Sequence, residues 1–240
     1  MNYLQEHNAG SIIRCTSQIY KRNFLKIVII YALPAIPAHL IFFKVMEGGN
    51  TFWIISSYLA LIAVGLFAMG SITVAVSDIC VGNPAAVIRS YKRLSGSLAG
   101  RLFVANLLQS LLIGIGSILL IVPGILMFIW YMFVPIIIVL ENSSLKEAFR
   151  RSKALGKGFY WRNLGILMIF YGVLIAFFMV VSIVVTLTGF ASIQAPVALT
   201  FFVTIIILPI LFVTIILIYY DMRVRKEGYD SYRLSEDLRR

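Results

Sequence analysis

The chain has 240 residues, of which 60% are hydrophobic and only 13% are charged, and its mean hydropathy is +0.94. Soluble domains are about 45–50% apolar and about 25% charged. A chain of this length has too little interior volume to hide the excess apolar surface from water. The composition therefore predicts an integral membrane protein and argues against a soluble enzyme domain, a secreted disulfide scaffold or a disordered chain.

The chain is strongly basic, with 21 Lys and Arg against 10 Asp and Glu and a net charge of +11. In a membrane protein such an excess is typical of cytoplasmic loops and of contact with anionic lipid, so we expect no nucleic-acid partner. Cys15 and Cys80 lie far apart, as do His7 and His39, and none has the spacing of metal ligands. We expect no cofactor and no metal site.

The first unit begins with a polar segment, residues 1–23, in which Ser11–Lys21 has the apolar spacing of an amphipathic helix. Residues 24–76 then form a predicted helical hairpin. Its two spans are Ile27–Phe43, extendable to Phe24, and Phe52–Val76, because each lacks Asp, Glu, Lys and Arg and is close to the length that crosses a bilayer.

The second unit, residues 77–140, is predicted to carry an amphipathic helix that opens at Asn83-Pro84, an N-cap followed by proline. The uncharged stretch Leu102–Leu140 that follows would be about 58 Å long as one helix, which is too long for one crossing. Since a Pro-Gly pair marks a turn, Pro123-Gly124 divides it into two spans, Leu102–Ile121 and Gly124–Leu140.

The third unit, residues 141–221, opens with Ser144-Leu-Lys-Glu147, which has the pattern of a capping box. The predicted amphipathic helix is followed by two further spans, Leu164–Leu187 and Pro196–Tyr219. Residues 222–240 form a basic tail. Prolines 34, 37, 135 and 209 lie within spans, where each removes a backbone hydrogen bond and permits a bend.

The distribution of charge supports six spans rather than five. With six, 20 of the 21 basic residues lie on one side of the membrane and only Lys44 lies on the other. With Leu102–Leu140 as one span, the division would be 8 against 13. The positive-inside rule therefore predicts six helices with both termini cytoplasmic. The predicted fold is one all-α membrane domain, residues 1–240, made of three hairpins that each follow a cytoplasmic amphipathic helix.

Charged residues at the cytoplasmic boundary are the candidate functional residues. Asp78, Glu141 and Asp221 each stand where a hairpin returns, and they are either ion pairs that fix helix ends or an acidic ring at the mouth of a cavity. Cations close to them are Arg89, Arg151 and Arg223. The amphipathic helices are either topological anchors or a platform for lipid headgroups or a partner, and their candidate headgroup contacts are Lys92, Arg93, Lys146, Arg150 and Lys153.

Two stretches resemble the membrane domain attached to some bacterial glycerophosphoryl diester phosphodiesterases, and related uncharacterised six-helix membrane proteins. The first combines Pro123-Gly124, Glu141, Glu147-Ala148, Ser152 and Lys157-Gly158; the second reads Tyr219-Tyr220-Asp221-x-Arg223-x-Arg225-x-Glu227-Gly228. The resemblance implies a bacterial plasma membrane location. It does not bring the catalytic barrel, because only ten residues follow Asp230, so we expect no phosphodiesterase activity.

Three functions are consistent with these features. The first is a non-enzymatic membrane module that binds anionic lipid headgroups or organises a membrane or cytoplasmic protein partner through its basic face. The alternative is a transporter or permease-like subunit that uses Asp78, Glu141 and Asp221. A membrane enzyme acting on lipid would need a nucleophile or metal ligands at the interface, and the sequence contains no catalytic motif of that kind.

Overall fold

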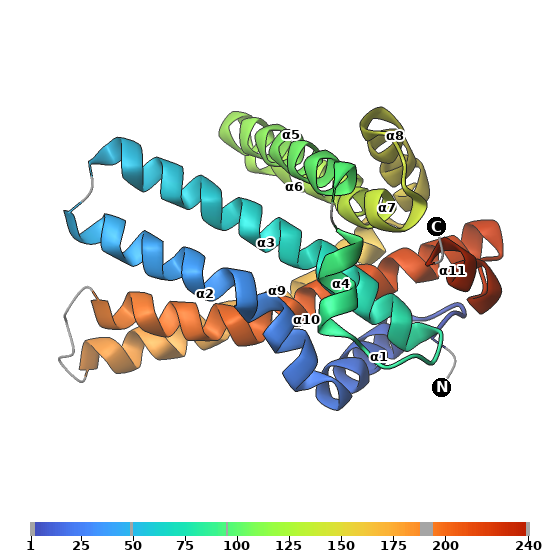
Figure 1. Ribbon diagram of the computed structural model, residues 1–240, viewed down its shortest axis with the longest axis horizontal. Coiled ribbons are helices and arrows are strands. Elements are labelled where there is room, and N and C mark those ends of the chain that lie inside the picture. Colours follow the sequence, from blue (N-terminus) through green and yellow to red (C-terminus); the bar gives the residue numbers. More distant parts are fainter. Residues whose placement is uncertain (1–2, 49, 95, 188–193, 239–240) are drawn as a thin grey trace.

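The computed structural model describes residues 3–48, 50–94, 96–187 and 194–238, and every regular element in these ranges is a helix. Figure 1 shows long helices that extend to the left and short helices that gather at the right. The elements are α1 Ala9–Arg22, α2 Phe24–Gly48, α3 Thr51–Cys80, α4 Val87–Arg93, α5 Ser97–Leu119, α6 Ile121–Tyr131, α7 Val134–Glu141, α8 Leu145–Gly156, α9 Tyr160–Leu187, α10 Gln194–Glu227 and α11 Ser231–Asp237.

Five stretches within the described residues are long and apolar enough to cross a membrane, as an all-α membrane protein requires. They are Phe24–Met46, Ser97–Leu119, Val122–Glu141, Tyr160–Val184 and Thr204–Glu227. The second predicted span lies in α3, whose part Phe67–Cys80 is a shorter apolar stretch and is not among the five.

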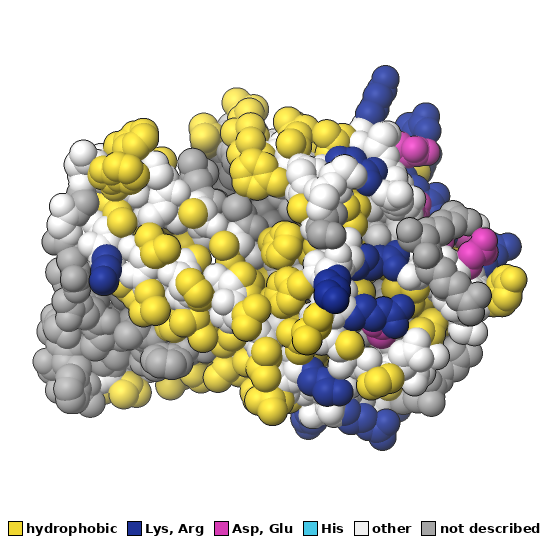
Figure 2. Space-filling model, in the orientation of Figure 1, with side chains coloured by type: hydrophobic (Ala, Val, Ile, Leu, Met, Phe, Trp, Pro, Cys, Tyr) yellow, Lys and Arg dark blue, Asp and Glu magenta, His cyan; other side chains and the backbone are white. Residues whose placement is uncertain are grey.

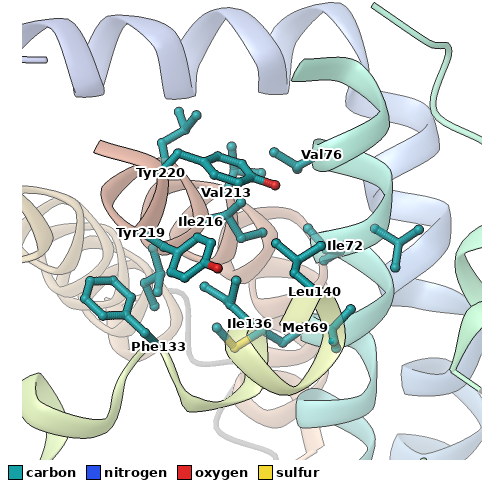
Figure 3. Packing of buried hydrophobic residues seen from close by; sticks show 14 of the residues in the cluster. Met69, Ile72, Val76, Phe133, Ile136, Leu140, Val213, Ile216, Tyr219 and Tyr220 are labelled. Carbon is teal, nitrogen blue, oxygen red and sulfur yellow. The ribbon is translucent and has the colours of Figure 1, made fainter. Parts of the chain in front are cut away.

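Helix α10 is the centre of the bundle. In its most apolar stretch 72% of the residues are buried, against 11% in α9, whose apolar side chains face outward. Figure 3 shows where α3, α7 and α10 meet: Ile72, Ile136 and Tyr219 point toward one another and are fully buried. Because lipid tails are as apolar as these side chains, the junction is stabilised by close packing between the helices rather than by transfer from water.

Charge is concentrated at one end of the molecule. Helices α1, α4, α8 and α11, together with both ends of the chain, lie in the right half of Figure 1, and dark blue Lys and Arg side chains gather there in Figure 2. Lys44 lies near the far end of α2. On the face that Figure 2 shows, many yellow apolar side chains lie between these two ends. We call the basic side, which α1, α4, α8 and α11 form, the charged end.

The start of α4 differs from the sequence prediction. The helix begins at Val87, with Ala86 as its N-cap, and not at Asn83-Pro84. Asn83 instead donates its N–H to the Asp78 carbonyl at 2.8 Å, Gly82 donates to Ile79, and Gly82 has a φ of +88°. This pattern ends α3, because paired backbone bonds around a left-handed glycine satisfy the last carbonyls of a helix. Helix α8 does begin after Ser144, although the Ser144 side chain makes no capping hydrogen bond.

The turn between α5 and α6 also differs from the prediction. The chain turns at Leu120, which is extended, and Pro123-Gly124 lies in the first turn of α6, where a proline needs no hydrogen-bond donor. Gly124 packs directly on Ser117: a Cβ on Gly124 would lie 2.9 Å from the Ser117 Cα. Glycine is therefore required here for close helix packing rather than for the turn itself.

Candidate functional site

The short helices α1, α4 and α8 each place a hydroxyl group on the backbone of another helix, and for α4 and α8 that backbone is interrupted at this point. The first case is α4. Pro34 has no N–H, so the Ile30 carbonyl in α2 loses its normal helical donor. The Tyr91 hydroxyl of α4 donates to that carbonyl instead. A buried backbone carbonyl is thereby satisfied from a neighbouring helix, which fixes α4 to the bend in α2.

Helix α8 does the same at the break between α6 and α7. Pro135 lies at the start of α7, and the chain between the two helices is a turn at Met132 and Phe133. The fully buried Ser152 hydroxyl donates to the Trp130 carbonyl at 2.8 Å and accepts from the Phe133 N–H at 3.3 Å. One hydroxyl therefore satisfies a backbone acceptor and a backbone donor that the break exposes.

Helix α1 makes a related contact, although not at the carbonyl that a proline leaves without a donor. The Tyr20 hydroxyl donates to the Ile206 carbonyl of α10. The carbonyl that loses its helical donor at Pro209 is that of Ile205. Burial raises the pKa of both Tyr20 and Tyr91 to about 12, so each phenol keeps its proton, and can donate, far above neutral pH. Sequence reasoning did not select these hydroxyl groups; the presence of one in each short helix was the available signal for this arrangement.

The charged groups at the same end form separate clusters. Asp221 is fully buried and accepts from the His7 backbone N–H at 2.7 Å, from Arg162 at 2.6 Å and from Arg225 at 3.1 Å. Both arginines also donate to the His7 carbonyl. Asp221 therefore connects the segment before α1 to α9 and α10. Its partners all belong to the folded chain, so its carboxylate holds these segments together rather than binding a ligand.

Glu141 belongs to a second cluster. It accepts from the Tyr219 hydroxyl at 2.8 Å and pairs with Arg151 and, at 3.8 Å, with Arg223. Burial alone would lower the pKa of Arg151, but the charges and hydrogen bonds of Glu141 and Glu227 together outweigh it and raise the pKa above its usual value. At the end of α10, Glu227 pairs with both Arg151 and Arg223. In α11, Asp237 accepts from Arg223 at 3.0 Å, so the cluster includes both helices.

Asp78 stands apart from both clusters. Its side chain is fully buried, and its Oδ1 lies 3.5 Å from Arg89 Nη1. Neither carboxylate oxygen accepts a hydrogen bond from the part of the chain that the structure describes. Among the described residues, no arginine bridges Asp78, Glu141 and Asp221 to one another. The structure thus brings Arg89 to Asp78 and Arg151 to Glu141, whereas Arg223 lies at Glu141 and not at Asp221.

The predicted lipid contacts occupy different surroundings. Arg93 is half-buried and donates to the backbone carbonyls of Asp237 at 2.5 Å and Leu238, so it holds α11 in place. The Lys153 ammonium lies 4.0 Å above the Trp130 ring. The side chains of Lys92, Lys146, Arg150 and Lys153 are exposed. Sequence reasoning did not select three residues that take part in these clusters, namely Arg162, Glu227 and Asp237.

A pocket of about 400 Å³ lies between α8 and the end of α10. Its charged lining consists of Glu147, Arg150, Arg151, Lys226 and Glu227. In the described ranges, no group of three His, Cys, Asp or Glu side chains is arranged to hold a metal ion. The site is therefore a surface of basic and acidic groups whose chemistry is ion pairing and hydrogen bonding.

Comparison of the chain with protein-family models, with curated proteins and with solved structures finds no match.

Proposed function

We propose that this chain is a six-span membrane protein without catalytic activity that binds lipid headgroups, or a partner, through its charged end on the cytoplasmic side of a bacterial plasma membrane. One observation carries the proposal: the Lys and Arg side chains visible in Figure 2 gather at one end of an apolar helical bundle, in the distribution that the positive-inside rule describes. In this proposal α3 is added to the five apolar stretches as the remaining span, since its 30 residues give a helix of about 45 Å.

The arrangement of the short helices supports the same role. Helix α8 turns Ala148, Ser152 and Leu155 into the bundle and leaves Lys146, Arg150 and Lys153 exposed. Helix α1 buries Ile12, Thr16 and Ile19 in the same way. A helix with one apolar face and one cationic face suits the plane of the membrane interface, where each Lys or Arg contributes about 1 kcal/mol of attraction to anionic lipid.

The topology is tested by cysteine labelling in intact cells. Single cysteines replace Lys92, Lys146, Ser231 or Thr51 in a chain whose Cys15 and Cys80 are serine. A maleimide that does not cross membranes should label only Thr51→Cys, and permeabilised cells should allow labelling of all four. Labelling of the other three in intact cells would contradict both the six-span arrangement and the cytoplasmic termini.

The lipid role is tested by titrating phosphatidylglycerol onto the protein in a neutral detergent. The double variant Lys146→Gln/Lys153→Gln removes two exposed cations, so we expect its affinity to fall about 5- to 30-fold. The control is Lys44→Gln, which removes a cation at the opposite end and should leave the affinity unchanged. Equal loss in both would show a general effect of net charge, and no loss in either would contradict lipid binding at this face.

A transporter is the second candidate, and Asp78 is the observation that favours it. Buried ionisable groups in membrane proteins often mark ion or proton pathways. Asp78 pairs with Arg89 but accepts no hydrogen bond from the described residues, whereas Asp221 accepts several. Proton uptake into proteoliposomes that Asp78→Asn abolishes would support this function. Absence of uptake by the unaltered protein would count against it.

A further inference from the structure

The pocket between α8 and α10 has a fixed base. Arg151 Nη2 lies 2.9 Å from the Glu227 carboxylate, and Arg151 also pairs with Glu141. The Lys226 ammonium donates to the carbonyls of Ala154 at 2.9 Å and Lys157 at 2.8 Å. Since an ammonium has three N–H groups, Lys226 is held in place with one donor still uncommitted. The base therefore needs no ligand to be stable, and it presents a positioned positive charge.

The rim of the pocket is different. Glu147 and Arg150 line the pocket and are both exposed. Neither makes a hydrogen bond or ion pair with any residue in the described part of the chain. Of the five charged groups that line the pocket, three have no ion-pair partner among the described residues: a guanidinium at Arg150, an ammonium at Lys226 and a carboxylate at Glu147.

These three groups complement a particular combination of charges. A guanidinium binds phosphate oxygens through two parallel N–H groups, and an ammonium binds them as a point charge. A carboxylate accepts hydrogen bonds from a primary ammonium group. A ligand with a phosphate alone would leave Glu147 unpaired beside its own negative charge, which is unfavourable. A polyphosphate would increase that repulsion.

We propose that the α8–α10 pocket binds the phosphoethanolamine group, with the phosphate at Arg150 and Lys226 and the ammonium at Glu147. The proposal rests on the lipid-binding function proposed above and names its class of ligand. The same group occurs in phosphatidylethanolamine and in soluble glycerophosphoethanolamine. A volume of about 400 Å³ lies within the range of small-molecule pockets and is sufficient for a headgroup.

The test measures lipid bound to the full-length protein in detergent by native mass spectrometry, with equal amounts of phosphatidylethanolamine and phosphatidylglycerol. We expect the unaltered protein to prefer phosphatidylethanolamine at least about fivefold. Glu147→Gln should remove this preference and keep phosphatidylglycerol binding, whereas Arg150→Gln should weaken both. Glu6→Gln and Arg14→Gln, which change exposed charges outside the pocket, are the matched controls and should behave as the unaltered protein.

Further probes identify the source of the group. Phosphatidylcholine, whose ammonium has no N–H, should bind more weakly than phosphatidylethanolamine. Competition by glycerophosphoethanolamine would show that the headgroup is sufficient, and its absence would show that the site needs the lipid; each result supports the proposal. A preference that survives Glu147→Gln, or no preference in the unaltered protein, would overturn it. The Lys146 and Lys153 experiment uses residues outside the pocket, so failure of either proposal can be told apart.

Discussion

The bond between Tyr91 and the Ile30 carbonyl makes a quantitative prediction about the bend in α2. Tyr91→Phe removes only the hydroxyl, and the aromatic ring remains stacked on Phe67, with ring centroids 6.0 Å apart. The Ile30 carbonyl would then have neither the Tyr91 hydroxyl nor a backbone N–H from Pro34. An unsatisfied buried polar group costs about 1–3 kcal/mol. We expect the thermal midpoint to fall by about 4–8 °C for a loss of about 2 kcal/mol.

The decisive measurement is a double-mutant cycle with Pro34→Ala. Alanine restores the N–H at position 34, which can donate to the Ile30 carbonyl as in an unbroken helix. The Tyr91 hydroxyl then becomes dispensable, so Tyr91→Phe should cost little in the Pro34→Ala background. The expected coupling between the two substitutions is about 1–2 kcal/mol, measured as the difference in unfolding between the four proteins in one detergent.

The control is Tyr232→Phe, which removes a hydroxyl from a side chain that is 75% exposed and should leave the thermal midpoint unchanged. Equal costs of Tyr91→Phe in the two backgrounds would refute the reasoning, because the hydroxyl would not be replacing the donor that Pro34 lacks. A neutral Tyr91→Phe in the unaltered protein would refute it as well.

Three further predictions test other parts of the charged end. Asp221→Asn removes the charge that holds two arginines and the His7 N–H, so it should destabilise the protein by about 3 kcal/mol in thermal unfolding. The control is Glu6→Gln, at the exposed end of the same network, which should change stability by less than about 1 kcal/mol. A destabilisation of the same size in both would contradict the assignment of Asp221 as the buried centre. Gly124→Ala should lower stability by about 1–3 kcal/mol, because the new methyl group would contact Ser117. Gly114 has open space around it, so Gly114→Ala should leave the thermal midpoint unchanged. Equal thermal midpoints of the two variants would disprove the close packing of α5 on α6. Burial raises the pKa of Tyr20 to about 12, above a value of about 10 in an unfolded chain, so its neutral form contributes stability that is complete below pH 10 and lost as the pH rises toward 12. Tyr20→Phe should therefore lose less stability than the unaltered protein between pH 10 and 12, and parallel pH profiles of the two would rule this out.

The partners of Asp221 show how far sequence spacing reaches. Arg223 is two residues away, and side chains at that spacing point to different sides of a helix, whereas Arg225 is four residues away on the same side. Helical spacing alone thus favours Arg225, which the structure places 3.1 Å from Asp221. The second partner, Arg162, comes from α9, and no local rule indicates it.

Composition and periodicity by themselves determined that this is a membrane-embedded helical protein with its cations at one end, because these properties depend on the transfer of each segment from water and on local helix geometry. They also located the prolines that interrupt the long helices. Only the tertiary structure decided that Tyr91 and Ser152 complete the backbone hydrogen bonding where the helices are interrupted. The reason is physical: an unsatisfied carbonyl constrains its surroundings to supply a donor, and which distant helix supplies it depends on how all the helices pack.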